Sequence, residues 1–185
     1  MLVFGDYVFI PFAFCVQCHY LLNYDDFENS WMPVLILILY FIGYYIFRTA
    51  NSQKNQYKTD PNKPIWGKTP ATIGGKLLIS GFWGIGRHMN YTGDLIMAFA
   101  YCLPCGTQLG GYFYAIYLFT LLTHRAYRDD TKCKNKYKAI WKEYCSAVPY
   151  VYLPFKPIDS LMTGLGKFLY LLTNKDDLDL KDKGT

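Results

Sequence analysis

The chain has 185 residues and a formal net charge of +5, and its residues are 52% hydrophobic, 19% aromatic and only 18% charged. This balance argues against an ordinary water-soluble domain and favours a membrane protein. The positive charge alone would also suit nucleic acid, but the basic residues are interleaved with Trp, Tyr and His near the ends of apolar segments. That placement favours a pocket for a polyanionic cofactor at the membrane face, and we expect no nucleic-acid partner.

Three apolar blocks are expected to form membrane helices, and they cover residues 2–22, 31–47 and 91–122. The second block has no charged residue and ends directly before Arg48. Its length approaches the ~20 residues that a helix needs to cross ~30 Å of hydrocarbon. The first block contains Asp6, so it is a weaker span whose carboxyl group should face protein or water rather than lipid.

The basic residues predict the topology. By the positive-inside rule, the basic stretches 48–87 and 125–142 face the cytosol. Residues 91–122 must then enter the membrane and return, with a turn at 104–111, and arms of ~12 to 14 residues are short for a full crossing. We therefore predict an all-α fold, a multi-pass membrane helix bundle with a re-entrant-like helical hairpin and cytosolic basic segments.

The end of the chain has a different composition. Residues 161–172 predict a short amphipathic helix, and residues 174–185 alternate charges with few bulky side chains, which is typical of disorder. We therefore expect a membrane domain over residues 1–157 and a separate appendage over 158–185.

Two Cys-x-x-Cys pairs raise the question of a metal site. Cys15 and Cys18 lie within an apolar segment, whereas Cys102 and Cys105 lie at the predicted hairpin turn. The predicted topology does not place the first pair near the second. Four such cysteines could hold zinc, but we expect buried free thiols and no metal.

The sharpest chemical signal is the basic stretch 124–144. On a helix, five of its charged residues share one face, because their spacing is i, i+3, i+4, i+7 and i+11: Arg125, Arg128, Asp129, Lys132 and Lys136. The spacing alone also fits a solvated helix with an internal pair between Arg125 and Asp129. Because the stretch starts directly after the apolar hairpin, its charges should be partly desolvated, where arginine can bind phosphate through two hydrogen bonds.

Five motifs occur in a fixed order along the chain. They are Asn-Ser-Gln-Lys-Asn at 51–55, Lys-Leu-Leu-Ile-Ser-Gly-Phe-Trp-Gly at 76–84, Arg-His-Met-Asn-Tyr-Thr-Gly-Asp-Leu at 87–95, His-Arg-Ala-Tyr-Arg-Asp at 124–129 and Val-Pro-Tyr at 148–150. In this order and spacing they resemble the family of delta-14 sterol reductase, lamin B receptor and 7-dehydrocholesterol reductase. The resemblance covers roughly residues 1–157.

The resemblance implies a helical protein of the endoplasmic reticulum membrane or the continuous nuclear envelope. It also implies that a sterol is held from within the bilayer and that NADPH enters from the cytosol. Carried over by position, it places the following residues around NADPH: Lys54, Leu78, Trp83, His88, Asn90, Tyr91, Asp129, Cys133, Lys134, Asn135, Lys136, Tyr137 and Tyr144. Lys58 stands where the family usually has arginine, and Lys138 where it commonly has glycine.

Three arginines join this set on the charge argument, because each could contact phosphate directly or hold a residue that does: Arg87, Arg125 and Arg128. The reaction also needs an acid, since an isolated alkene resists hydride until it is protonated. The candidates are Asp129, Tyr91 and Asp6. Asp129 next to two arginines should stay ionised and act as an organiser, which favours Tyr91 as donor, while Asp6 lies in a segment that resembles a motif facing the sterol.

The substrate is predicted from short stretches within the resemblance. Ile-Met-Ala at 96–98 and Leu-Pro-Cys-Gly at 103–106 favour delta-14 sterol reductase, whereas Phe-Trp-Gly at 82–84 and Tyr-Cys-Leu at 101–103 favour 7-dehydrocholesterol reductase. We prefer the first. A non-catalytic scaffold like the lamin B receptor and a membrane methyltransferase of the isoprenylcysteine type are the alternatives. Family members are longer than this sequence, so the amino-terminal helices that complete the sterol cavity are expected to lie outside it.

Overall fold

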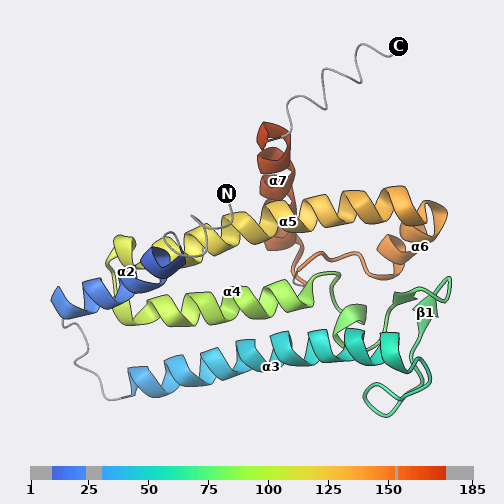
Figure 1. Cartoon of the computed structure of the whole chain (residues 1–185), viewed down its shortest axis with the longest axis horizontal. Coiled ribbons are helices and arrows are strands. Elements are labelled where there is room, and N and C mark those ends of the chain that lie inside the picture. Colours follow the sequence, from blue (N-terminus) through green and yellow to red (C-terminus); the bar gives the residue numbers. More distant parts are fainter. Residues whose placement is uncertain (1–9, 24–30, 153, 174–185) are drawn as a thin grey trace. The chain divides into compact units, whose positions relative to one another are not determined.

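The computed structural model describes residues 10–23, 31–152 and 154–173, and most of them are helical (Figure 1). Asp6 and the tail 174–185 lie outside this range. The chain forms two compact units, one made of Met1–Arg48 with Asn90–Phe119 and the other of Thr49–Met89 with Thr120–Thr185. Two long helices pass from one unit to the other, α3 (Met32–Thr59) and α5 (Phe113–Tyr137).

The first unit contains the predicted hairpin. Its first helix is α4 (Met89–Cys102), its second is the start of α5, and the turn consists of two 3-10 segments, η3 (Leu103–Cys105) and η4 (Leu109–Tyr112). Ring contacts between Tyr101 and Tyr114, whose centroids are 6.1 Å apart, join the two helices near this turn. The turn therefore lies where the sequence predicts it.

The remaining helix of the first unit, α2 (Ile10–Asn23), packs against the two 3-10 segments. The buried side chain of Gln17 donates a hydrogen bond to the sulfur of Cys102 at 3.5 Å, and the thiol of Cys105 lies 3.9 Å from the Gln17 carbonyl oxygen. α2 therefore folds back onto the turn and brings the first Cys-x-x-Cys pair near the second, a placement that the predicted topology left open. All four thiols are free; Cys102 and Cys105 are buried as expected, whereas Cys15 and Cys18 are exposed, which corrects the expectation of buried thiols for the first pair.

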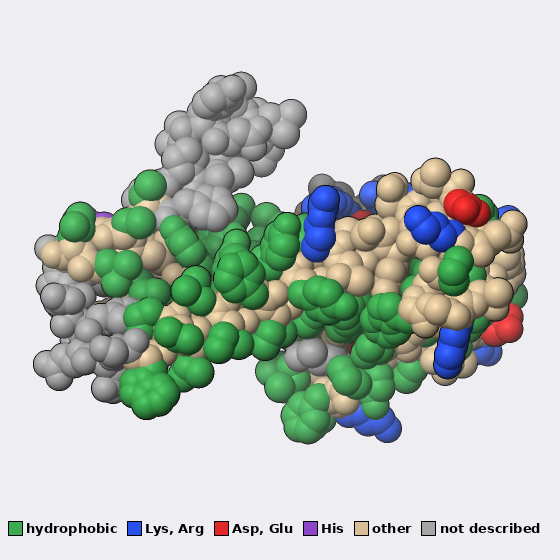
Figure 2. Space-filling view, turned by 90° about the horizontal axis from the view of Figure 1, so that it is seen from below, with side chains coloured by type: hydrophobic (Ala, Val, Ile, Leu, Met, Phe, Trp, Pro, Cys, Tyr) green, Lys and Arg blue, Asp and Glu red, His purple; other side chains and the backbone are tan. Residues whose placement is uncertain are grey.

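Among the described residues, one helix is long and apolar enough to cross a membrane, and it is α3. Its first half exposes Val34, Leu37, Phe41 and Tyr45 over 54% to 61% of their surfaces. Figure 2, which views the molecule from the α3 side, shows hydrophobic side chains gathered along this half. Water-soluble proteins rarely leave so long an apolar face uncovered, so this face agrees with the prediction of a membrane protein.

Two glycines let α3 and α4 approach closely within the first unit. A Cβ atom on Gly93 would lie 2.6 Å from the Phe47 nitrogen and 2.7 Å from the Gly43 carbonyl oxygen. A Cβ atom on Gly43 would lie 2.9 Å from the Gly93 carbonyl oxygen. Small residues facing each other in this way are typical of helix packing in membranes.

The second unit has two small apolar cores. One contains Ile73, Trp141, Tyr144 and Val148, and the other contains Ile65, Leu78 and Trp83. The elements around them are β1 (Thr72–Ile73), β2 (Leu77–Leu78), η2 (Gly81–Gly84), α6 (Ala139–Ala147) and α7 (Lys156–Thr173).

The antiparallel pair of β1 and β2 departs from the all-α prediction. It forms because Gly74 and Gly75 adopt positive φ angles of +59° and +64°, which allows a tight turn between the two short strands.

The helices differ from the prediction in length. α3 continues past the apolar block to Thr59, and α5 runs without a break from the apolar arm through the basic stretch to Tyr137, so the predicted arm of ~12 to 14 residues is too short. No Gly or Pro interrupts residues 113–137, and the Arg and Lys residues that follow the apolar arm are good helix formers. α7 begins at Lys156, with Pro157 in its first turn, where proline is tolerated.

Candidate functional site

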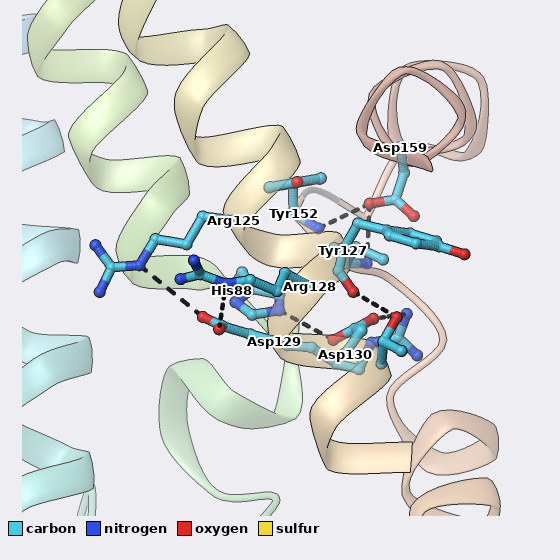
Figure 3. A network of polar contacts seen from close by, with 11 residues as sticks. His88, Arg125, Tyr127, Arg128, Asp129, Asp130, Tyr152 and Asp159 are labelled. Atoms are coloured by element: carbon cyan, nitrogen blue, oxygen red, sulfur yellow. Dashed lines mark hydrogen bonds and ion pairs between the residues drawn. The ribbon is translucent and has the colours of Figure 1, made fainter. Parts of the chain in front are cut away.

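The most buried charged contacts of the second unit meet at Asp130 on α5 (Figure 3). One of its oxygens lies 3.2 Å from Arg87 Nη2, and the other lies 3.0 Å from His88 Nε2. The three side chains expose only 11%, 13% and 21% of their surfaces for Arg87, His88 and Asp130 respectively. Asp130 therefore fixes the two residues that begin the Arg-His motif.

The neighbouring carboxylate, Asp129, has a different environment. It lies 4.0 Å from Arg125 Nε, one helical turn away, and 3.8 Å from Arg128 Nε, and all three side chains are more exposed than Arg87 and Asp130. The structure thus contains the pair between Arg125 and Asp129 that the spacing predicts. Asp130 was missed by the sequence analysis, although it directly follows the recognised motif.

Aromatic side chains surround the guanidinium group of Arg87. Its central carbon lies 5.8 Å from the centroid of the Trp141 ring, and Trp141 in turn contacts Tyr144 with centroids 5.2 Å apart. Burial raises the pKa of the Tyr144 hydroxyl, although Arg87 acts against the shift. Tyr144 is therefore a neutral hydrogen-bonding group at physiological pH.

A second group of predicted residues lies around the end of α3. The Lys54 ammonium lies 4.5 Å from the centroid of the Trp83 ring, and the Trp83 indole donates a 2.8 Å hydrogen bond to the Ala50 carbonyl. Asp129 and Cys133 of α5 are within electrostatic range of Lys54. Residues of the first motif are thus brought close to Asp129 of the fourth motif and to Cys133, which lies one helical turn further along α5.

The thiol of Cys133 is influenced by charged side chains of the same group. Burial raises its pKa, the carboxylates Asp130 and Asp129 act in the same direction, and Lys54 and Lys136 oppose them. Two cations and two carboxylates of the second unit therefore lie within electrostatic range of one half-buried sulfur.

A cavity of about 760 Å³ opens where α5 bends into α6. It is lined by Lys134, Asn135, Lys138, Ala139, Trp141, Lys142 and Cys145. Lys138 occupies the bend with φ +48° and ψ −111°, a conformation that favours glycine. Because glycine adopts this conformation without strain, the conformation explains why the family resemblance predicts glycine at this position.

Several buried nitrogen atoms in this unit have no hydrogen-bond partner among the described residues: Gln53 Nε2, Arg87 Nε and Arg128 Nε. Unpaired buried donors are costly and rare in folded proteins. Gln53 lies on α3, Arg87 lies just before α4 and Arg128 lies on α5.

The remaining predicted residues have other positions. Lys58 lies one helical turn beyond Lys54 on α3, and Leu78 packs with Trp83 in the second apolar core. Asn90 and Tyr91 lie in the first turn of α4 and belong to the first unit, and Asp6 lies outside the described residues. Within the described part of the chain, no three His, Cys, Asp or Glu side chains are grouped to hold a metal ion.

Comparison with known proteins shows which proteins this chain is similar to. Delta(14)-sterol reductase of Arabidopsis thaliana is 49% identical over 158 residues, which is 84% of this chain and 42% of the relative. Delta(14)-sterol reductase TM7SF2 of Mus musculus is 48% identical, over 84% of this chain and 38% of the relative. The 7-dehydrocholesterol reductase of Xenopus laevis is 47% identical, over 81% and 35% respectively. The chain thus spans about two fifths of the length of these relatives.

The match at the family level covers the first unit and the second unit up to the start of α7. Residues 1–156 match the ergosterol biosynthesis ERG4/ERG24 family, and they include every motif quoted above together with Asp130 and the α5–α6 cavity. With this match and relatives that are nearly half identical, the chain belongs to the ergosterol biosynthesis ERG4/ERG24 family, a family of membrane proteins.

Proposed function

We propose that this chain forms the NADPH-binding part of a delta(14)-sterol reductase, an enzyme that reduces the C14–C15 double bond of a sterol. The observation that carries the proposal is the convergence of Lys54, Trp83, Asp129 and Cys133 from distant motifs. The names of the plant and mouse relatives support the choice of reaction.

The side chains of the second unit suit a dinucleotide with several phosphates. Arg125 and Arg128 present guanidinium groups that can bind phosphate oxygens in pairs, and Asp129 between them orients both. Lys54 and Lys58 add point charges from α3. Gln53 Nε2, a buried donor with no hydrogen-bond partner among the described residues, can serve the same ligand.

When bound, NADPH supplies a hydride to one carbon of the alkene. The protein's own groups must deliver a proton to the other carbon and exclude water. Tyr91 and Asp6 are the proposed donors, and Asp129 is proposed to organise the cations rather than to give up a proton. Trp83 and Phe82 supply apolar surface beside the lysine.

The cellular setting is part of the proposal. We infer a multi-pass protein of the endoplasmic reticulum membrane whose sterol enters from the bilayer and whose basic segments face the cytosol. The apolar first half of α3 and the charged stretch at the end of α5 support it. Reduction of 7-dehydrocholesterol is the second candidate, because the Xenopus relative is nearly as similar as the other two.

The test is turnover of a delta-8,14 sterol and of 7-dehydrocholesterol by microsomes carrying this chain, alone or with the amino-terminal half of a delta(14)-sterol reductase. We expect NADPH-dependent loss of the delta-8,14 sterol by the combined form. Arg125→Gln should weaken NADPH binding, whereas Lys63→Gln, an exposed lysine in the loop after α3, should not. Normal NADPH affinity in Arg125→Gln would remove Arg125 from the site, and turnover of 7-dehydrocholesterol alone would favour the second candidate.

A further inference from the structure

The last helix, α7 (Lys156–Thr173), lies beyond the residues 1–156 that match the family. It packs against α5 within the second unit. Gly166 sits directly on the Thr123 carbonyl oxygen, where a Cβ atom would collide. The Tyr170 ring lies 5.2 Å from that of Tyr127.

The start of α7 is fixed as well. Asp159 is buried, and one of its oxygens accepts hydrogen bonds from the backbone amides of Val151 at 2.9 Å and Tyr152 at 2.7 Å (Figure 3). At the other end, the Thr173 hydroxyl lies 3.1 Å from His124 Nε2. α7 is therefore held at both ends against the rest of its unit.

The side chains of α7 fall into three sectors around its axis, because successive residues turn by about 100°. The first sector contains Asp159, Met162 and Gly166 and is buried. The second, which we call the apolar stripe, contains four exposed side chains at helical spacing: Ile158 (44% exposed), Leu161 (72%), Phe168 (58%) and Leu172 (52%).

The third sector is polar and lies on the side away from the apolar stripe. Its exposed side chains are Lys156, Ser160 and Lys167, and the half-buried Leu171 lies at its edge. An exposed apolar stripe opposite a lysine-bearing side is the pattern of a helix that lies in the plane of a membrane surface. Long lysine side chains can reach the headgroups while the apolar stripe enters the acyl boundary.

The position at which α7 crosses α5 also fits a location at the membrane surface. α5 has no Asp, Glu, Lys or Arg from Phe113 to Leu122, and four charged residues follow between Arg125 and Asp130. α7 meets α5 at Thr123 and Tyr127, at the change from apolar to charged. A helix that leaves hydrocarbon for water meets the lipid headgroups at such a change.

We propose that α7 is an in-plane membrane-surface helix whose apolar stripe is covered by the lipid bilayer. The absent part of the family domain is a poorer occupant, because the family match ends where α7 begins. A second copy of the chain would leave the lysines on the far side without a role. The proposal does not depend on reductase activity.

The experiment uses the whole chain in vesicles of phosphatidylcholine with a minor fraction of phosphatidylserine, with tritium in the acyl chains. p-Benzoylphenylalanine replaces one residue at a time, at Leu161 or Phe168 on the apolar stripe and at Ser160 or Lys167 on the polar side. After irradiation, tritium that migrates with the protein measures contact with acyl chains. Phe168 is the most conservative position, because one aromatic side chain replaces another.

We expect several-fold more lipid adduct from positions 161 and 168 than from 160 and 167. The same samples made with the amino-terminal half present should give the same pattern. Equal labelling on both sides would overturn the proposal. Crosslinks from positions 161 and 168 to protein, either to the amino-terminal half or to a second copy of the chain, would also overturn the proposal. A chain with both Phe168→Gln and Leu161→Gln should bind lipid less strongly through α7. The weaker binding is measured as increased cleavage by trypsin after Lys167. Unchanged cleavage would also contradict the proposal.

Discussion

Asp129 and Asp130 are neighbours on α5, but their carboxylates have different surroundings. Asp130 joins Arg87 and His88 in a mostly buried group, whereas Asp129 pairs with two more exposed arginines at longer distances. Removing one partner of a buried charged contact costs more stability than removing one partner of an exposed contact, because the remaining buried charge is left uncompensated. The two residues therefore allow a matched comparison.

Asp130→Asn should lower the free energy of unfolding by about 1.5–3 kcal/mol, because a partly buried guanidinium loses its counter-charge. Asp129→Asn should cost less than about 1 kcal/mol, as exposed pairs do. Thermal unfolding in detergent of the chain combined with the amino-terminal half of a delta(14)-sterol reductase measures both. If Asp129 orients Arg125 and Arg128, Asp129→Asn should weaken NADPH binding more than Asp130→Asn does. Equal losses of stability would show that Asp130 is not the structural member of the pair.

The thiols of Cys133 and Cys145 give a prediction about pH. Burial raises the pKa of both, and for Cys145 the Arg87 charge opposes the shift while Asp130 adds to it. A raised pKa means less thiolate at any pH below it, so iodoacetamide should modify both more slowly than it modifies the same cysteines after denaturation. The rates should still rise above pH 9. Mass spectrometry of the labelled peptides measures this, and a plateau below pH 9 would contradict it.

The sequence indicates most members of the site but not how they are paired. Helical spacing places Arg125 and Asp129 together because they lie one turn apart. It cannot place Arg87 on Asp130, because that contact joins residues 43 positions apart and depends on how the loop after η2 packs. Local periodicity reports local contacts only, which explains why Asp130 was missed.

At the scale of elements, the bend between α5 and α6 is the most strained point that the sequence signals. Lys138 adopts φ +48° and ψ −111°, a region that costs a residue with a side chain ~1–3 kcal/mol. The common glycine of the family would adopt it without that cost.

Lys138→Gly should therefore raise the free energy of unfolding by about 1 kcal/mol. Lys142→Gly is the matched control, because it removes another lysine from the same cavity but places glycine inside α6, where it should cost about 1 kcal/mol. Thermal unfolding measures both. A loss of stability in Lys138→Gly would show that the lysine side chain makes contacts that outweigh the strain.

The contact between α3 and α4 gives a second prediction for elements. Gly93→Ala should destabilise the first unit by about 1–3 kcal/mol, because the added carbon overlaps the backbone of α3. Gly164→Ala on α7 has no atom within 4 Å of the added carbon and should be neutral or slightly stabilising. The comparison uses thermal unfolding again, and similar values for the two variants would exclude a tight α3–α4 contact.

Element types were largely predictable, and their bounds were less so. The apolar arm and the basic stretch of α5 look like separate segments in composition, but helix formation depends on the absence of Gly and Pro rather than on polarity. The small β-hairpin carries a readable signal, because Gly74-Gly75-Lys76 separates Thr72-Ile73 from Leu77-Leu78. The hydrophobic pattern around it is too short to separate strand from loop.

At the scale of the whole molecule, the uncovered first half of α3 predicts firm membrane attachment. The chain should remain in the membrane pellet after extraction with alkaline carbonate. Leu37→Asp combined with Phe41→Asp should release it, since a charge at the centre of a span costs ~2.5–3.5 kcal/mol. Arg125→Gln should leave the membrane fraction unchanged. Release of the unmodified chain would mean that α3 does not span a bilayer.

α5 also has a consequence for how such chains can change length over evolution. It is a single rod of 25 residues, about 37 Å long, with an uncharged end and a charged end. One inserted residue between these ends would rotate every later side chain by about 100° and turn Arg125 and Asp129 away from Lys54. Length variation among relatives should therefore avoid this rod and collect in connections such as residues 60–71, where added residues leave the phase of the helix untouched.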